Sequence, residues 1–255
     1  MFVDESGQFR RPHEGAPPEH GLVVGVLFRD TPGNRARLAD VVRALRLRHG
    51  RRVKGSKLDD GDYASICALV ADVGYLAPIG VHFDRQHGEA CAAMLVDLVR
   101  EFEHLPQRTA RDVLILAAMR RTQLELESAV GRNLGTYLVQ LVFMIRQVAA
   151  WFRAEGIFPD MDVTLDEKLV ASDRDLIAFV PRLAVATVFP ELYENRLSAI
   201  WAERGPTSGV VSTDELSDGL VIADALAYAY GRVQRGQDAS GLFASRIAAC
   251  TRERD

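Results

Sequence analysis

The sequence predicts a mixed α/β domain interrupted by a helical segment. Near the start, Leu22–Phe28 is a continuous apolar run of strand length, as in strands that are buried on both faces. The middle of the chain is helical in pattern almost without interruption, and strand signals return at Asp162–Asp166. The 255 residues, 48% hydrophobic and 26% charged, are ordinary for a globular protein. We expect residues 1–86 and 159–255 to form one core and residues 87–158 to form an all-helical insertion.

Two further strands are expected in the first part of the chain. The segment Phe2–Gly7 begins with strand-prone residues and closes on a Ser-Gly pair typical of turns, so we expect the strand to end near Asp4. It pairs with Leu22–Phe28 as a hairpin with a long connection. Tyr75–Phe83 also has strand character, and Pro78 favours an edge position or a bulge.

Helical spacing of apolar residues predicts most of the remaining elements. The expected helices are Asn34–His49, Asp60–Val73, Glu89–Glu103, Thr109–Val130, Leu134–Glu155, Arg174–Leu183, Ser217–Gln234 with Ser217 as its N-cap, and Ser240–Cys250. The helix Leu134–Glu155 is apolar nearly all round, which predicts burial on several sides, either between lobes or in a dimer interface. Short strands are expected at Val185–Val188 and Leu197–Trp201.

The charge is small overall but unevenly distributed. The formal net charge is −4, which argues against non-specific coating of nucleic acid. No acid occurs between Val41 and Leu58. That stretch carries a basic strip made of Arg43, Arg46, Arg48, Arg51, Arg52, Lys54 and Lys57. The strip indicates either a specific anionic partner or a solvated helix face that runs into a loop.

Other features narrow the class of protein. Cys67, Cys91 and Cys250 are widely spaced, which supports neither a disulfide framework nor a thiolate zinc site. Asp4 and Glu5 stand where a signal peptide would carry basic and then apolar residues. No stretch is apolar enough for a membrane span, and no G-x-S-x-G or H-E-x-x-H motif is present. We expect a cytoplasmic protein that does not enter a membrane.

Three isolated acids lie at the edges of apolar elements. Asp4 follows the first strand, Asp166 ends the strand-like Asp162–Asp166, and Asp224 lies among small apolar residues of a late helix. A buried acid is costly unless a cation or a set of hydrogen-bond donors compensates for its desolvation. Carboxylate oxygens are the ligands that Mg²⁺ prefers, and two such ions can activate a water and stabilise the leaving oxygen of a phosphodiester. We therefore expect one Mg²⁺ or Mn²⁺ site assembled from distant parts of the chain.

Three segments carry a family resemblance. Asp4-Glu5-Ser6-Gly7, Lys54-Gly55-Ser56-Lys57-Leu58 and Gly219-Leu220-Val221-Ile222-Ala223-Asp224 resemble, in this order, motifs of the family catalogued as domain of unknown function 3800. The resemblance spans nearly the whole chain. It implies a ribonuclease H-like fold, with a mixed sheet flanked by helices, and a metal-dependent nuclease. Asp4, Asp166 and Asp224 are then metal ligands and catalytic residues, and Glu5 is an auxiliary ligand or an acid beside the site.

The sequence departs from the family pattern at two positions. The family carries a Glu-x-Lys element, and its Glu falls at Arg52 in this chain. The Gln of the closing Gly-Leu-Gln-Leu-Ala-Asp motif is Val221. If that Glu is a metal ligand in the family, this chain has one ligand fewer, with Glu5 or Glu167 as substitutes.

The basic loop has its own expected role. Lys54 and Lys57 flank Gly55-Ser56, and we expect Lys54, Ser56 and Lys57 to bind a phosphate of the substrate. The simpler alternative is a solvated loop.

The leading hypothesis is a metal-dependent nuclease or phosphodiester hydrolase that binds nucleic acid. One alternative is a catalytically inert scaffold of the same fold that binds nucleic acid or a protein partner, and another is a nucleotide-dependent phosphotransferase. The helical insertion is a candidate for homodimerisation or for docking another protein. Each acid also has a structural alternative: Asp4 begins a turn, Asp166 leaves a strand, and Asp224 pairs with an arginine.

Overall fold

The computed structural model describes residues 1–7, 19–83, 134–154, 163–166, 208–212 and 217–238, together with single positions between 89 and 124 and at 241 and 245. Several predicted elements lie outside the described residues. They are the loop between the first two strands, the helix Arg174–Leu183, the short strands Val185–Val188 and Leu197–Trp201, and most of the helices predicted at 89–103, 109–130 and 240–250.

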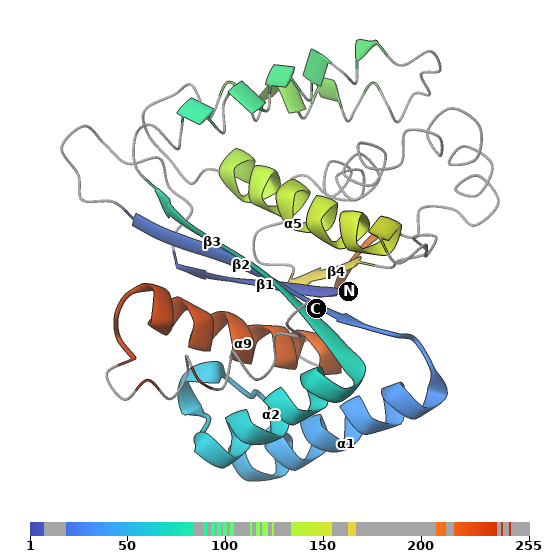
Figure 1. Cartoon of the computed structure of the whole chain (residues 1–255), viewed down its shortest axis with the longest axis vertical. Helices are drawn as coiled ribbons and strands as arrows, with labels where there is room; N and C mark the ends of the chain where they lie inside the picture. The colour runs from blue at the N-terminus through green and yellow to red at the C-terminus, as the bar shows by residue number, and fades with distance from the viewer. Residues whose placement is uncertain are drawn as a thin grey trace.

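The described part is a mixed α/β structure built on a five-stranded sheet (Figure 1). Its strands are β1 (Phe2–Gly7), β2 (Glu19–Phe28), β3 (Gly74–Phe83), β4 (Val163–Asp166) and β5 (Ser208–Ser212). They lie in the order β3-β2-β1-β4-β5. The first three strands pair antiparallel, whereas β1 with β4 and β4 with β5 pair parallel. The predicted hairpin and the edge position of the proline-containing strand β3 are confirmed.

Helices cover both faces of the sheet (Figure 1). The helices α1 (Pro32–His49), α2 (Asp60–Val73) and α9 (Asp218–Gln234) lie on one face, and α5 (Leu134–Ala154) lies on the other. All four were predicted to within two residues at each end. A short 3-10 turn, η1 (Gly55–Lys57), lies between α1 and α2.

Local sequence signals explain where these helices begin and end. Thr31 caps α1 by accepting a hydrogen bond from the Asn34 amide, and Pro32 at the first position is already constrained to a helical φ. Gly50 ends the helix at φ 86°, a conformation that favours glycine. A capping box begins α2, where Asp59 and Asp62 each accept a hydrogen bond from the other's backbone amide. Ser217 occupies the predicted N-cap position of α9, although its side chain makes no capping hydrogen bond.

Alternation along the strands assigns the two faces of the sheet. A Cβ on Gly25 would lie 2.7 Å from the sulfur of Met144 in α5, so the β2 residue Gly25 and its β1 partner Val3 face α5. On the other face, Phe2 lies so close to Gly219 of α9 that a Cβ there would overlap its ring. The main apolar core forms between this second face and α1, α2 and α9. The position of Asp4, two residues after Phe2, therefore belongs to the core side.

One prediction about the strands is wrong, and one strand was not predicted. Asp4 does not end β1, because the pairing continues from Asp4 with Val24 to Gly7 with Gly21. The Ser-Gly pair continues as strand since its partner β2 extends back to Glu19. Strand β5 was not predicted at all. Its sequence, Ser-Gly-Val-Val-Ser, has too few apolar residues for a local signal, and it is held by parallel pairing with β4.

The helix α5 matches its predicted burial. Its buried side chains are Val139, Gln140, Leu141, Val142, Met144, Ile145, Val148, Ala149 and Phe152. Phe143 on the same helix is 44% exposed. Among the residues that the structure describes, no helix is long and apolar enough to cross a membrane.

Candidate functional site

Asp4 is a buried carboxylate in the middle of β1. It is only 7% exposed, and its backbone pairs with Val24 of β2, whose side chain belongs to the main apolar core. Phe2 and Ser6, on the same face of β1, both touch α9, since a Cβ on Gly219 would overlap the Phe2 ring and one on Gly231 would overlap the Ser6 hydroxyl. Asp4 therefore lies on the face of β1 that α9 covers. A mid-strand acid in this layer is costly unless polar groups or a cation compensate for its desolvation.

Asp166 follows Asp4 in register on the neighbouring strand. The parallel pairing of β1 with β4 joins Phe2 to Thr164 and Val3 to Leu165, and one further step along each strand reaches Asp4 and Asp166. Of Asp166 the structure describes the backbone alone, which also pairs with Ser212 of β5. Each acid thus comes directly after the last residue that pairs β1 with β4.

Asp224 lies on α9 and is held by the loop that contains η1. Its Oδ2 accepts a hydrogen bond of 2.8 Å from the backbone N–H of Gly55, and its Oδ1 is 3.5 Å from Nζ of Lys54. The side chain of Asp224 is 28% exposed and that of Lys54 is 35% exposed. The structural alternative paired Asp224 with an arginine; among the described residues its charged partner is instead Lys54, from the predicted phosphate loop.

Gly55 is required by the close approach of the loop to α9. A Cβ at this position would lie 2.7 Å from Cβ of Tyr228 and 3.2 Å from Cα of Ala225. The hydroxyl of Tyr63 in α2 donates to the carbonyl of Gly55 at 2.8 Å and lies 3.3 Å from that of Ala225. Tyr63 thus joins the loop to α9, and burial raises the pKa of its phenol well above the usual value, so the hydroxyl remains a donor.

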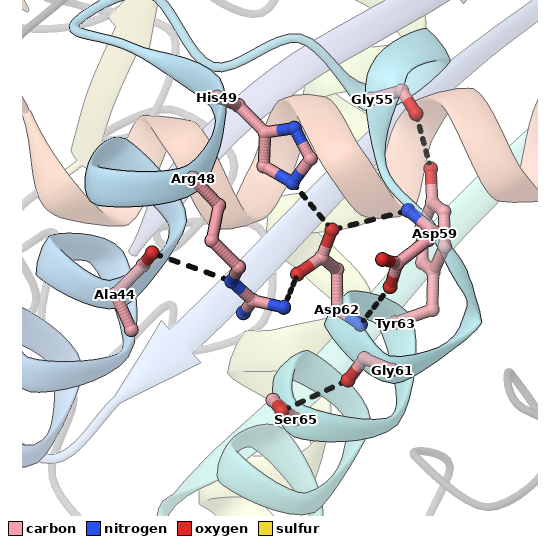
Figure 2. A network of polar contacts seen from close by, with 9 residues as sticks. All are labelled: Ala44, Arg48, His49, Gly55, Asp59, Gly61, Asp62, Tyr63 and Ser65. Atoms are coloured by element: carbon pink, nitrogen blue, oxygen red, sulfur yellow. Dashed lines mark hydrogen bonds and ion pairs between the residues drawn. The ribbon is translucent and has the colours of Figure 1, made fainter.

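A polar network fixes the two ends of this loop (Figure 2). The carboxylate of Asp62 is fully buried; it forms an ion pair with Arg48 and contacts Nε2 of His49 at 2.6 Å. It also accepts the Asp59 amide at 3.1 Å, while Asp59 accepts the Asp62 amide at 2.9 Å. These contacts tie the end of α1 to the start of α2, so the intervening basic loop is anchored at both ends.

The Asp62 network has a structural role. Arg48 lies in the last turn of α1, where positive charge is favoured by the helix dipole. The hydrogen bond from the Asp62 amide holds the pKa of the Asp59 carboxyl below its usual range. This is expected of a carboxylate that caps a helix, because the hydrogen bond stabilises its charged form. The sequence contained a signal for this cap, Asp-x-x-Asp before an apolar run, but nothing in it indicated that Arg48 and His49 would meet Asp62.

Two arginines, Arg232 and Arg235, lie at the C-terminal end of α9. Arg232 donates to the Tyr228 hydroxyl at 3.2 Å, and its guanidinium lies 5.9 Å from the centre of the Tyr228 ring. A Cβ on Gly231 would lie 3.1 Å from a guanidinium nitrogen of Arg235, next to the Ser6 hydroxyl. The sequence reading missed Tyr63, Tyr228 and these two arginines, because each is placed by tertiary packing and none by a motif.

The other predicted site residues are placed less closely. Ser56 and Lys57 lie in η1 and are exposed. Glu5 pairs with Val23, one step beyond Asp4 on β1. Because strand positions alternate between the two faces of a sheet, the position of Glu5 belongs to the opposite face from that of Asp4. Glu167 lies outside the described residues. Among the side chains that the structure describes, which include those of Asp4 and Asp224 but not that of Asp166, no three acids, histidines or cysteines form a cluster suited to a metal ion.

Comparison with known proteins adds no further information on the site. No protein-family model, no curated protein and no solved structure matches this chain.

Proposed function

We propose that this protein is a metal-dependent nuclease or related phosphodiester hydrolase of ribonuclease H-like fold, in which Asp4, Asp166 and Asp224 bind Mg²⁺ or Mn²⁺. The observation that carries the proposal is the buried carboxylate of Asp4. It stands in the middle of β1 on the face covered by α9, and Asp166 comes directly after the residues of β4 that pair with β1.

The sheet supports the fold assignment. Three antiparallel strands followed by two strands that pair parallel, in the order β3-β2-β1-β4-β5, are the arrangement expected of a ribonuclease H-like sheet. The three segments that resemble the domain of unknown function 3800 family lie on β1, on the η1 loop and on α9. Two of these three segments are in direct contact through Gly55 and Asp224.

The donor set fits a hard divalent cation. Carboxylate oxygens from separate elements suit Mg²⁺ and Mn²⁺, which keep several waters in their coordination shell. A bound ion would supply an activated water and stabilise the leaving oxygen of a phosphodiester. Asp4 contributes a buried carboxylate, a group whose desolvation a bound cation can offset.

The protein's own cations have a separate task. The ammonium of Lys54 is one-third exposed and held near the site by the anchored loop, so it is available to bind a phosphate oxygen of the substrate. Ser56 and Lys57, both exposed in η1, would extend the same contact. Glu5, the predicted auxiliary acid, belongs by strand alternation to the other face of β1, the one that α5 covers, so it is not assigned to this site.

Two observations favour a second candidate, the catalytically inert scaffold that binds nucleic acid. Arg52 is exposed at the position where the resemblance expects a Glu, and Asp224 already has two partners, Lys54 and the Gly55 amide. A site with one acid fewer and one carboxylate engaged would bind phosphate more readily than a second metal ion.

Cleavage and metal binding together distinguish the two candidates. Labelled single-stranded and double-stranded RNA and DNA are incubated with the wild-type protein and with Asp4→Asn and Asp224→Asn, with Mn²⁺ or Mg²⁺ present. Mn²⁺ affinity is measured by calorimetry on the same samples. Asp30→Asn is the matched control, because Asp30 is an exposed acid paired with Arg35 on the surface.

The nuclease proposal expects cleavage and Mn²⁺ binding by the wild type and the control, and loss of both in the Asp4 and Asp224 variants. Undiminished cleavage by either site variant would contradict it. Binding of nucleic acid without turnover under any metal would favour the scaffold.

A further inference from the structure

A surface hollow lies between α1 and the start of α9, away from the acids of the proposed metal site. The residues that line it are Ala39, Arg43, Arg46, Leu47, Arg51 and Asp218. Three of them are arginines and one is an acid, so the hollow is positive in balance. These arginines belong to the basic strip that the sequence carries before η1.

The structure divides the arginines of the hollow into two kinds. Arg46 is largely buried and pairs with Asp218 at 2.7 Å, so the acid of the hollow is already neutralised. Arg43 contacts Asp40 at 3.2 Å, but both side chains are about two-thirds exposed, and such a pair is weak and easily exchanged. Arg51 is exposed and has no ion pair with any residue that the structure describes. Arg43 and Arg51 can therefore bind an external anion.

Leu47 indicates what kind of anion fits. It follows Arg43 by one helical turn, so the two share a face of α1, and it is 83% exposed within the lining of the hollow. A free inorganic anion has no apolar surface that could pack against Leu47. A nucleic acid strand offers both chemistries, because its phosphates bind guanidinium groups and its sugars and bases present apolar surface.

We propose that this hollow binds the phosphate backbone of a nucleic acid strand outside the metal site, with Arg43 and Arg51 on phosphate and Leu47 against a sugar or base. The inference rests on the proposed function for its substrate class. The same strand can reach both places. Arg51 precedes Lys54 by three residues, a span of at most about 11 Å, and Asp218 precedes Asp224 by about 9 Å along the axis of α9.

The test measures, by fluorescence anisotropy, the affinity of the protein for a labelled single-stranded oligonucleotide. The titrations are done in EDTA at several salt concentrations. The double variant Arg43→Gln, Arg51→Gln is compared with Arg35→Gln, Arg37→Gln. The control removes the same charge at two exposed residues of α1 that lie outside the hollow and pair with Asp30 and Asp72. EDTA makes the result independent of catalysis.

The inference expects a loss of affinity of about tenfold or more in the hollow variant and little change in the control. Affinity falls as salt rises, and each lost phosphate contact reduces the steepness of log affinity against log salt by about 0.7 for single strands. Loss of two contacts therefore reduces it by about 1.4. Equal affinity and equal slope in the two double variants would overturn the inference, as would failure of the wild type to bind any strand.

The outcome separates from that of the proposed function. If the wild type cleaves nucleic acid with Mn²⁺ while the hollow variant binds like the control, the nuclease stands and the hollow does not. If binding falls only in the hollow variant while no protein cleaves under any metal, the hollow is supported and the nuclease is not.

Discussion

The backbone N–H of Gly55 donates a hydrogen bond of 2.8 Å to Oδ2 of Asp224, across 169 positions of the chain. The bond joins the basic loop before α2 to the late helix α9. It brings a predicted phosphate-binding residue, Lys54, to within 3.5 Å of a predicted metal ligand. Two segments that carry the family resemblance are therefore one structural unit, and several predictions concern how that unit is held.

The close approach at Gly55 predicts that Gly55→Ala destabilises the protein and displaces the loop. The added Cβ would lie 2.7 Å from Cβ of Tyr228, and overpacking of this kind costs about 1–3 kcal/mol. Gly33→Ala is the control, because nothing lies within 4 Å of its Cβ and alanine is favoured in a helix by about 1 kcal/mol. Urea unfolding measures both. Equal stability of Gly55→Ala and wild type would show that the contact is absent in solution.

Removal of the Tyr63 hydroxyl is expected to loosen the loop from α9. Tyr63→Phe leaves the carbonyl of Gly55 without its buried donor, at a cost of about 1–3 kcal/mol. Ser65→Ala in the same helix removes an exposed bond to Gly61 and is expected to change stability by less than about 0.5 kcal/mol. Amide hydrogen exchange should show faster exchange at Gly55 in Tyr63→Phe alone. Unchanged protection of that amide would contradict the role of Tyr63.

The cap of α2 predicts a pH dependence with a defined sign. Because the Asp62 amide lowers the pKa of Asp59 in the folded protein, this carboxylate stabilises the fold above its unfolded pKa. That stabilisation is lost as the pH falls through the folded pKa. Asp59→Asn keeps a capping oxygen but does not titrate. The difference in melting temperature between wild type and Asp59→Asn should therefore shrink as the pH falls below about 4. A difference that stays constant from neutral to acid pH would rule out this linkage.

The arginine at position 52 leads to a gain-of-function prediction. If the Glu that the resemblance expects there is a metal ligand, Arg52→Glu adds a carboxylate two residues before Lys54. We expect Mn²⁺ affinity to rise by about tenfold, the scale on which an added ligand or its supporting contact acts. Arg52→Gln, which removes the charge without adding a ligand, is the control. The same affinity in both variants would mean that position 52 lies outside the metal site.

Much of the fold was predictable because it is written in local patterns. The helices α1, α2, α5 and α9 follow from apolar spacing, and the long run Leu22–Phe28 from its continuous apolar character. The predicted end of β1, near Asp4, was wrong. It was inferred from Ser6-Gly7, a pair typical of turns, but the strand continues through this pair because it pairs with β2. Tertiary context decides such cases.

The candidate site was predictable only as a set of residue types. Asp4 and Asp224 were selected because an acid in apolar surroundings needs an explanation, and the structure places both beside α9 or on it. The hydrogen bond from Gly55 to Asp224 and the one from Tyr63 to Ala225 join residues more than 160 positions apart. No periodicity or short motif reports contacts at that separation.

The central proposal is that Asp4, Asp166 and Asp224 together form one site for a divalent metal ion. The most direct measurement is anomalous scattering from a crystal soaked in Mn²⁺. The proposed function predicts an anomalous peak whose ligands include carboxylate oxygens of all three residues. A crystal that shows no peak between β1, β4 and α9, with Asp224 still bound to Lys54 and the Gly55 amide, would contradict it.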